Sequence, residues 1–219
     1  PKPPFTTSTM QQDAGSRLGW GAQITMRIAQ RLYENGYITY MRTDSVNLSE
    51  QAISAARKAA KSLYGADHVA DSPRVYQGKS KNAQEAHEAI RPTGDTFKTP
   101  GELAPELSRD EFALYDLIWK RTVASQMADA KKMQQRVDFE TETSDKKRAV
   151  FRANGSVVTF PGFLAAYDDS LDENTKDEES SDRRLPSMNE GQKVSVSEII
   201  TEGHETKPPA RYTEPTLVK

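Results

Sequence analysis

Apolar residues recur at helical spacing through the first part of the chain. In residues 21–35, Ile24, Ile28 and Leu32 lie four positions apart, and Gly36 follows directly. This spacing turns one face of a helix toward a core, and glycine ends many helices because it readily adopts left-handed backbone angles. The pattern predicts a helix over 21–35 that ends at Gly36.

Two further helices are expected before residue 127. Ser49 is placed as an N-cap with Glu50 in the first turn. The helix it opens carries a stripe that ends at Gly65 and consists of Ile53, Ala56, Ala60 and Leu63. At Ser108, the sequence S-R-D-E puts Glu111 at the capping-box position. The helix predicted there runs toward Met127 through Phe112, Leu114, Leu117, Ile118 and Val123.

Beyond about Met133 the period changes from helical to alternating. In QQRVDFETET, the residues Val137, Phe139 and Thr141 alternate with charged neighbours, which is typical of a half-buried strand. Further strands are expected in RAVFRA, SVVTF, FLAAY and QKVSVSEII, divided by Asn154-Gly155, by Pro161-Gly162 and by an acidic loop. The fold class predicted is therefore α+β, helical first and β-rich second, with the start of another helix in the final KPPARYTEPTLVK.

The amino-acid composition excludes several classes of protein. The 219 residues are 35% hydrophobic and 28% charged, which suits a globular chain, and no apolar run is long enough for a membrane span. The opening PKPPFTTSTM lacks the layout of a signal peptide. No cysteine is present, so disulfides, thiol nucleophiles and cysteine-ligated zinc are excluded. This composition allows a reducing, cytoplasmic location without requiring it.

The net charge of −2 hides an uneven distribution. Residues 168–184 hold eight acids and three bases, which leaves a mildly basic remainder of +3. A balance of this kind permits nucleic-acid binding without requiring it, and the acidic stretch is expected to be a solvated loop.

The segment GYITYMRTDS (36–45) combines a phenol with a guanidinium. On an extended backbone Tyr40 and Arg42 project from the same face. Activating a tyrosine oxygen at neutral pH takes about 4 kcal/mol of phenolate stabilisation, and a neighbouring cation supplies part of it. Arginine also matches phosphate geometry. The pair suits attack on a phosphodiester. Spacing alone, however, favours a half-buried strand in which Tyr40 packs and Arg42 extends to solvent or pairs with Asp44.

A second candidate is QEAHEAIRPTG (84–94), where His87 precedes Arg91 by four residues. The second histidine of a zinc-binding helix is missing, so a zinc site is not expected. Histidine, arginine and Thr93 would suit holding a phosphate. The alternative is a helix end stopped by Pro92.

The stretch FTTSTMQQDAGSRLGWG (5–21) is rich in hydroxyls, amides and glycine. It could line the path of a single strand, or form a capped loop whose Trp20 enters the core; we expect the core position for Trp20. The chain has no GxxxxGK[ST] motif for ATP and no D-x-D motif for magnesium.

Four motifs in order resemble the type IA DNA topoisomerases of bacteria. They are TSTMQQDAGSRLGWG, AQRLYENGYITYMRTDSVNLS, QEAHEAIRPT and PPARYTEPTLVK, and the similarity runs through the whole chain. It implies an enzyme that cleaves one DNA strand through a 5′-phosphotyrosine intermediate, passes a strand and reseals. The implied outcome is relaxation of negative supercoils without ATP, on single-stranded and negatively supercoiled DNA.

The resemblance also assigns residues. Tyr40 matches the family's nucleophile, and Arg42 matches the arginine that contacts the scissile phosphate. His87 matches a histidine that assists by hydrogen bonding or proton handling. Arg91 and Thr93 share that motif, and the resemblance implies only that they lie close to DNA. No metal ligand is implied in this sequence.

The family's architecture implies three parts. Residues 1–126 match a helical gate domain that carries the tyrosine, and 127–207 match a β-rich arch segment with its acidic loop at 168–184. Residues 208–219 match the start of a segment returning to another domain. Mg²⁺ ligands belong to a toprim domain and further DNA contacts to a DNA-groove domain, and this sequence includes neither. The resemblance therefore implies that the chain needs those domains as partners and is inactive alone.

Two other classes use some of the same chemistry. Tyrosine recombinases and type IB topoisomerases place the tyrosine after their arginine–histidine set, whereas here Tyr40 precedes His87 and Arg91. A non-catalytic single-stranded DNA-binding or docking module would make the tyrosine incidental. These alternatives differ in the expected polarity of a trapped adduct and in whether Tyr40 matters at all.

Overall fold

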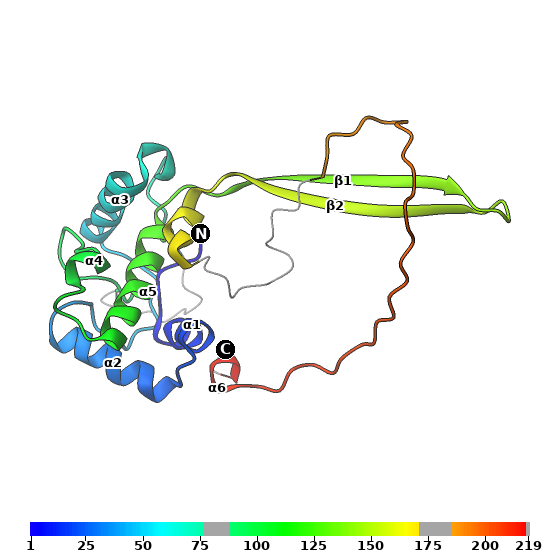
Figure 1. Ribbon diagram of the computed structural model, residues 1–219. Coiled ribbons are helices and arrows are strands. Elements are labelled where there is room, and N and C mark those ends of the chain that lie inside the picture. The colour runs from blue at the N-terminus through cyan, green and yellow to red at the C-terminus, as the bar shows by residue number, and fades with distance from the viewer. Residues whose placement is uncertain (77–87, 171–184, 218–219) are drawn as a thin grey trace. The chain divides into compact units, whose positions relative to one another are not determined.

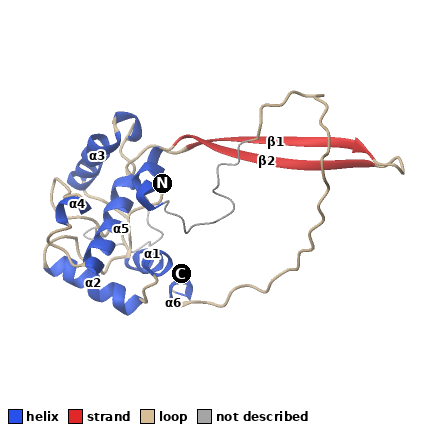
Figure 2. Ribbon diagram, viewed as in Figure 1, coloured by secondary structure: helices blue, strands red, loops and turns tan. Residues whose placement is uncertain are grey.

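A computed structural model describes residues 1–76, 88–170 and 185–217, and Figure 1 traces their course. The α-helices are α1 (Thr7–Leu18), α2 (Ala22–Glu34), α3 (Glu50–Tyr64), α4 (Pro100–Leu103), α5 (Arg109–Ser125) and α6 (Glu214–Leu217). Two 3₁₀ helices are η1 (Ala66–His68) and η2 (Gly162–Ser170), and the strands are β1 (Lys131–Glu142) and β2 (Arg148–Phe160). Helices and one two-stranded sheet confirm the predicted α+β class (Figure 2).

The described residues divide into two units. The helical unit holds residues 1–131, 160–170 and 212–217 apart from the undescribed 77–87, and the β unit holds 132–159 and 185–211. In the helical unit α5 is the centre, since α1, α2, α3, α4 and η2 all contact it. Most of the predicted acidic loop lies outside the described residues. No helix in the described part of the chain is both long and apolar enough to cross a membrane.

The three predicted helices are present, and their ends follow the predicted capping chemistry. Ser49 accepts a hydrogen bond from the amide of Ala52 at the start of α3, and Ser108 forms a capping box with Glu111 at the start of α5. After α2, Gly36 takes φ +78°. There the Tyr37 amide donates to the Leu32 carbonyl and the Gly36 amide to the Tyr33 carbonyl, a Schellman arrangement that turns the chain back over the helix.

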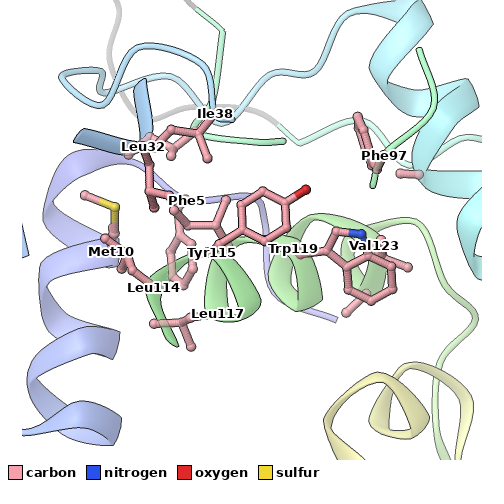
Figure 3. Packing of buried hydrophobic residues seen from close by; sticks show 14 of the residues in the cluster. Phe5, Met10, Leu32, Ile38, Phe97, Leu114, Tyr115, Leu117, Trp119 and Val123 are labelled. Atoms are coloured by element: carbon pink, nitrogen blue, oxygen red, sulfur yellow. The ribbon is translucent and has the colours of Figure 1, made fainter. Parts of the chain in front are cut away.

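The core of the helical unit is built around the buried side of α5. Figure 3 shows how its side chains meet those of the N-terminal segment and of α2. Leu114, Ile118 and Val123 are each fully buried, and so is Phe5. The Tyr115 ring is buried too, with its hydroxyl donating to the Lys98 carbonyl. Burial raises the pKa of Tyr115, so the phenol stays neutral and bonded.

Two details of the helical pattern differ from expectation. Ile24 and Leu63 belong to the predicted stripes but are 41% and 51% exposed. The stretch for which a capped loop was one expectation is helix α1, which opens with a capping box between Thr6 and Thr9 and buries Met10 and Ala14. Its hydroxyls cap the helix, and its two apolar contacts stabilise a segment of weak intrinsic propensity. Trp20 packs against the core, as predicted.

The β unit contains one long hairpin, β1–β2. Val137 and Phe139 are half-buried between exposed neighbours, as predicted, but Thr141 is exposed and Gln135 is half-buried instead. Opposite charges face each other across the strands, as Arg152 does with Asp138 at 2.7 Å. The predicted break at Asn154-Gly155 is wrong, because β2 continues through both residues. Ladder pairing with β1 holds that backbone extended despite the turn-forming dipeptide.

Three other predicted strands are not regular strands. FLAAY (163–167) lies in η2, where the Phe163 amide donates to the Ala128 carbonyl and Ala166 is buried in the helical core. A short apolar run does not distinguish strand from helix, and here packing against α5 decides. QKVSVSEII (192–200) has no strand assignment among the described residues and leaves Val196 and Ile200 exposed. The segment around Ile38 forms only an isolated antiparallel bridge, to Pro92.

Candidate active site

The two motifs singled out in the sequence lie side by side in the helical unit. The Thr39 amide donates to the Arg91 carbonyl at 2.9 Å, and the Thr93 amide donates to the Tyr37 carbonyl at 3.1 Å. On the other side of the second motif, Ile90 bridges to Phe5. Residues more than 50 positions apart in sequence thus share one small backbone network, and the tyrosine segment is one of its members.

The N-terminal segment in this network is itself anchored to α5. Arg121 is 6% exposed, and its Nε donates to the Pro3 carbonyl at 2.6 Å. Its Nη1 pairs with Asp13 at 3.2 Å, and its guanidinium lies 4.7 Å from the centre of the Phe5 ring. A buried arginine with all these partners is expensive to displace, so it fixes the edge against which Ile90 bridges.

Tyr40 and Arg42 are both exposed, and the backbone between and around them is held in place. Met41 is 4% exposed and Ile38 only 1%, so the chain is pinned to the core on either side of the Tyr40 side chain. The Thr7 hydroxyl donates to the Met41 carbonyl at 2.8 Å and accepts from the Thr43 amide at 2.8 Å. The start of α1 therefore sets the backbone on both sides of Arg42.

The two exposed side chains have few partners of their own. Tyr40 is 47% exposed, and its ring meets the Tyr33 ring edge to face, with the centroids 5.2 Å apart. Within the described residues, neither the Tyr40 hydroxyl nor the Arg42 guanidinium has a hydrogen bond or an ion pair. In particular, Arg42 does not pair with Asp44, which had been the alternative. Both polar groups are thus free to meet a ligand.

His87 lies outside the described residues. The next residue, Glu88, is held in place by three hydrogen bonds. The Glu88 carboxylate accepts from Arg91 Nε and Nη2, each at 2.8 Å, and from the Ser49 amide at 2.8 Å. Burial raises the pKa of Glu88, but the hydrogen bonds from Arg91 and Ser49 outweigh it, and the net pKa lies below the ordinary value. An ionised Glu88 therefore joins the histidine motif to the start of α3.

The remaining two predicted site residues face inward. Arg91 is 9% exposed, and its Nη1 donates to the Pro92 carbonyl at 2.8 Å, so its donors serve the protein. The Thr93 hydroxyl donates to the Gly36 carbonyl. Contact of either residue with DNA stays a prediction. As arranged, Arg91 and Thr93 tie the second motif to Glu88 and to the turn before Tyr40.

The site has no place for a metal ion among the residues described. No group of three or more histidine, aspartate or glutamate side chains with a metal-binding arrangement occurs there. The described residues therefore offer no such cluster of side chains to hold Mg²⁺.

Sequence reasoning missed three contributors to this geometry. Thr7 was read only as part of a hydroxyl-rich stretch, although it anchors residues 41–43. Tyr33 carried no signal beyond its place near the end of a helix. The Glu88–Arg91 pair could have been predicted from the sequence, because residues three positions apart lie on one helical turn. The sequence interpretation considered the histidine and the arginine of this motif instead.

The described residues thus present an exposed tyrosine and an exposed arginine on one anchored segment of the helical unit. A family model described as DNA topoisomerase matches residues 1–219, so the chain belongs to the DNA topoisomerase family. This confirms the resemblance to the bacterial type IA group.

Named relatives agree with that placement. DNA topoisomerase 1 of Mycolicibacterium smegmatis is 55% identical over 220 residues, which cover 100% of this chain and 24% of the relative. The corresponding protein of Synechococcus elongatus is 52% identical over 219 residues, again covering 100% and 24%. The structure of full-length topoisomerase I from Thermotoga maritima matches with a TM-score of 0.66 at 33% identity, covering 100% of this chain and 34% of that one. The chain spans about a quarter of the length of these curated relatives.

Proposed function

We propose that Tyr40 is the nucleophile of a type IA topoisomerase reaction. The observation that carries this is the pairing of an exposed Tyr40 and Arg42 with a backbone that is buried and hydrogen-bonded on both sides. Rigid backbone with free polar groups is what preorganised chemistry requires.

The proposed step is a transesterification. The Tyr40 hydroxyl loses its proton as its oxygen forms a bond to phosphorus. The bond from phosphorus to the 3′ oxygen breaks, and that oxygen takes up a proton to become a 3′ hydroxyl. The tyrosine then carries the 5′ phosphate. One phosphate ester replaces another at similar energy, so the reverse step reseals the strand without ATP.

Arg42 would neutralise charge on the phosphate during this exchange. Its guanidinium is exposed and unpaired within the described part of the chain, so no ion pair has to break before it meets DNA. Arginine donates two parallel hydrogen bonds to a phosphate and keeps its charge at all relevant pH values. Removing it should slow cleavage more than it weakens binding.

His87 would assist by hydrogen bonding or proton handling, since it directly precedes the anchored Glu88. For Arg91 and Thr93 we propose a positioning role close to DNA. Their donors already bind Glu88, Pro92 and Gly36, so direct phosphate contact would require breaking those bonds.

The rest of the activity would come from outside this chain. We propose that Mg²⁺ is held by a toprim domain, that a DNA-groove domain adds contacts to single-stranded DNA, and that the assembled enzyme relaxes negatively supercoiled DNA in the cytoplasm. The chain alone would neither cleave nor relax DNA. Relaxation by the purified chain that disappears in Tyr40→Phe would contradict this.

The test is complementation. The chain is mixed with a separately made N-terminal portion of the M. smegmatis relative, Mg²⁺ and end-labelled single-stranded DNA, then quenched with detergent. We expect a covalent adduct that is lost in Tyr40→Phe and reduced at least tenfold in Arg42→Ala; Arg109→Ala, an exposed arginine at the start of α5, is the control. An adduct that persists in Tyr40→Phe would contradict the proposal and favour a docking module.

A further inference from the structure

Tyr33 and Tyr40 form an exposed aromatic pair beside the proposed reaction site. Their ring centroids are 5.2 Å apart with an angle of 69° between the planes, so one ring presents its edge to the other's face. Tyr33 is 42% exposed and Tyr40 is 47% exposed, which means that the contact lies outside the core.

The fold brings these rings together by a specific turn. Tyr33 belongs to the last turn of α2, and Gly36 with φ +78° reverses the chain directly after it. The bridge from Ile38 to Pro92 then fixes the direction in which the next residues leave. This turn therefore places Tyr40 close to the C-terminal end of α2, where its ring contacts that of Tyr33.

Without a neighbour, a half-exposed tyrosine would exchange among staggered side-chain positions in nanoseconds. The Tyr40 hydroxyl has no hydrogen bond within the described residues that would select one of these positions. The Tyr33 ring is thus the specific contact available to restrain it. Reacting atoms must be placed to within a fraction of an ångström, so restraint of this ring bears directly on rate.

We propose that Tyr33 is a positioning residue that holds the Tyr40 phenol in its reactive orientation. The inference rests on the proposed role of Tyr40 as nucleophile. Tyr33 acts through its ring edge and face and not through its hydroxyl, so phenylalanine serves as well as tyrosine. Edge-to-face pairs stabilise by an amount that corresponds to roughly a two- to tenfold population change, and the effect on cleavage rate follows that range.

One measurement needs neither DNA nor catalysis. Fluorotyrosine is placed at position 40 alone, and the ¹⁹F NMR signal of the 219-residue chain is compared with that of a short peptide. We expect a signal shifted away from the peptide value, retained in Tyr33→Phe and moved toward the peptide value in Tyr33→Leu. Phe151→Leu, which removes a 55% exposed aromatic ring of β2, should leave the signal unchanged.

The second measurement is the rate of adduct formation in the complementation mixture, together with the Kd for the oligonucleotide. Tyr33→Leu should slow the adduct two- to tenfold at unchanged Kd, and Tyr33→Phe should restore the rate. An unchanged rate in Tyr33→Leu, in a mixture that does form adduct, overturns the positioning role alone. A weakened Kd with an unchanged ¹⁹F signal overturns it in favour of base stacking by Tyr33. No adduct from the unsubstituted chain overturns the proposed function itself.

Discussion

The helical unit and the β unit place their apolar side chains in opposite ways. The helical unit buries a continuous cluster that includes Phe5, Leu32 and Ile118. The β unit buries its apolar residues only in part and leaves several of them exposed, among them Phe151 at 55% and Ile199 at 69%. Both units have clear hydrophobic patterns in their sequence. Such a pattern therefore predicts which face of an element is apolar, but not whether other residues bury that face.

This difference bears on where chemistry can be precise. A half-exposed tyrosine is well placed only if the backbone beneath it is rigid, and the helical unit supplies that rigidity through Ile38, Met41 and Thr7. The β hairpin has cross-strand ion pairs at its surface, which stabilise little and are screened by salt. The candidate site thus lies in the unit that has a core.

The largest contrast should appear when the same substitution is made in both units. Ile118→Ala removes a fully buried side chain from α5 and should lower the free energy of unfolding by about 2–5 kcal/mol. Ile199→Ala, at a 69% exposed position, should change it by less than about 0.5 kcal/mol. Urea unfolding followed by far-ultraviolet circular dichroism, which reports on both units, measures this. Equal losses at the two sites would remove the contrast.

A somewhat smaller effect is expected where the chain leaves β2. Gly162 has φ +52°, and a Cβ there would lie 2.5 Å from the Asp129 carbonyl oxygen. Gly162→Ala should therefore destabilise the helical unit by about 2–3 kcal/mol, because the backbone itself must shift. Gly101→Ala is the matched control: its Cβ meets nothing within 4 Å, and it lies in α4. Thermal unfolding measures the difference. An equal Tm for the two variants would contradict the close approach of Gly162 to the Asp129 carbonyl.

The Glu88–Arg91 pair gives a pH-dependent contribution. Its hydrogen bonds lower the Glu88 pKa from the ordinary 4.5, so the stability is full above that value and lost as the pH falls below it. At pH 7, Glu88→Gln should cost about 1–2 kcal/mol, and the difference from the unsubstituted chain should shrink on acidification. Urea titrations at several pH values measure this. Glu142→Gln, at an exposed position of β1, should show no such trend, and a constant penalty at all pH values would contradict the assignment.

The smallest effect concerns the start of α5. Ser108 accepts from the Glu111 amide, and Ser108→Ala should cost about 1 kcal/mol. Ser62→Ala, at an exposed position inside α3, serves as control and should be neutral or slightly stabilising, because alanine is the better helix former. Thermal unfolding followed by far-ultraviolet circular dichroism measures this. If both variants had the same Tm, the cap would make no contribution to stability.

The helices and their caps could be predicted from the sequence, because local chemistry determines them. Ser108 with Glu111, and Gly36 after α2, are signals contained within a few residues. α1 could not be predicted in the same way, since burial of Met10 and Ala14 against distant residues decides it. For the same reason FLAAY became η2, where contact with the helical core overrode an ambiguous apolar run.

The candidate site divides along the same line. Tyr40, Arg42 and the histidine motif could be found from composition and spacing, and their adjacency in space follows the family resemblance. The anchoring by Thr7 and the ring contact of Tyr33 join residues whose sequence neighbours give no hint of them. Long-range hydrogen bonds and side-chain contacts require the folded backbone, so only the structure assigns these roles.

The most direct test of the account is to locate the covalent bond. The adduct from the complementation mixture is digested with nuclease and trypsin, and the peptide covering residues 32–42 is fragmented in a mass spectrometer. That peptide contains Tyr33, Tyr37 and Tyr40, so the fragment ions must separate three candidates. We predict a nucleotide joined through its 5′ phosphate to Tyr40. A nucleotide on Tyr33 or Tyr37, or a linkage through a 3′ phosphate, would contradict the account.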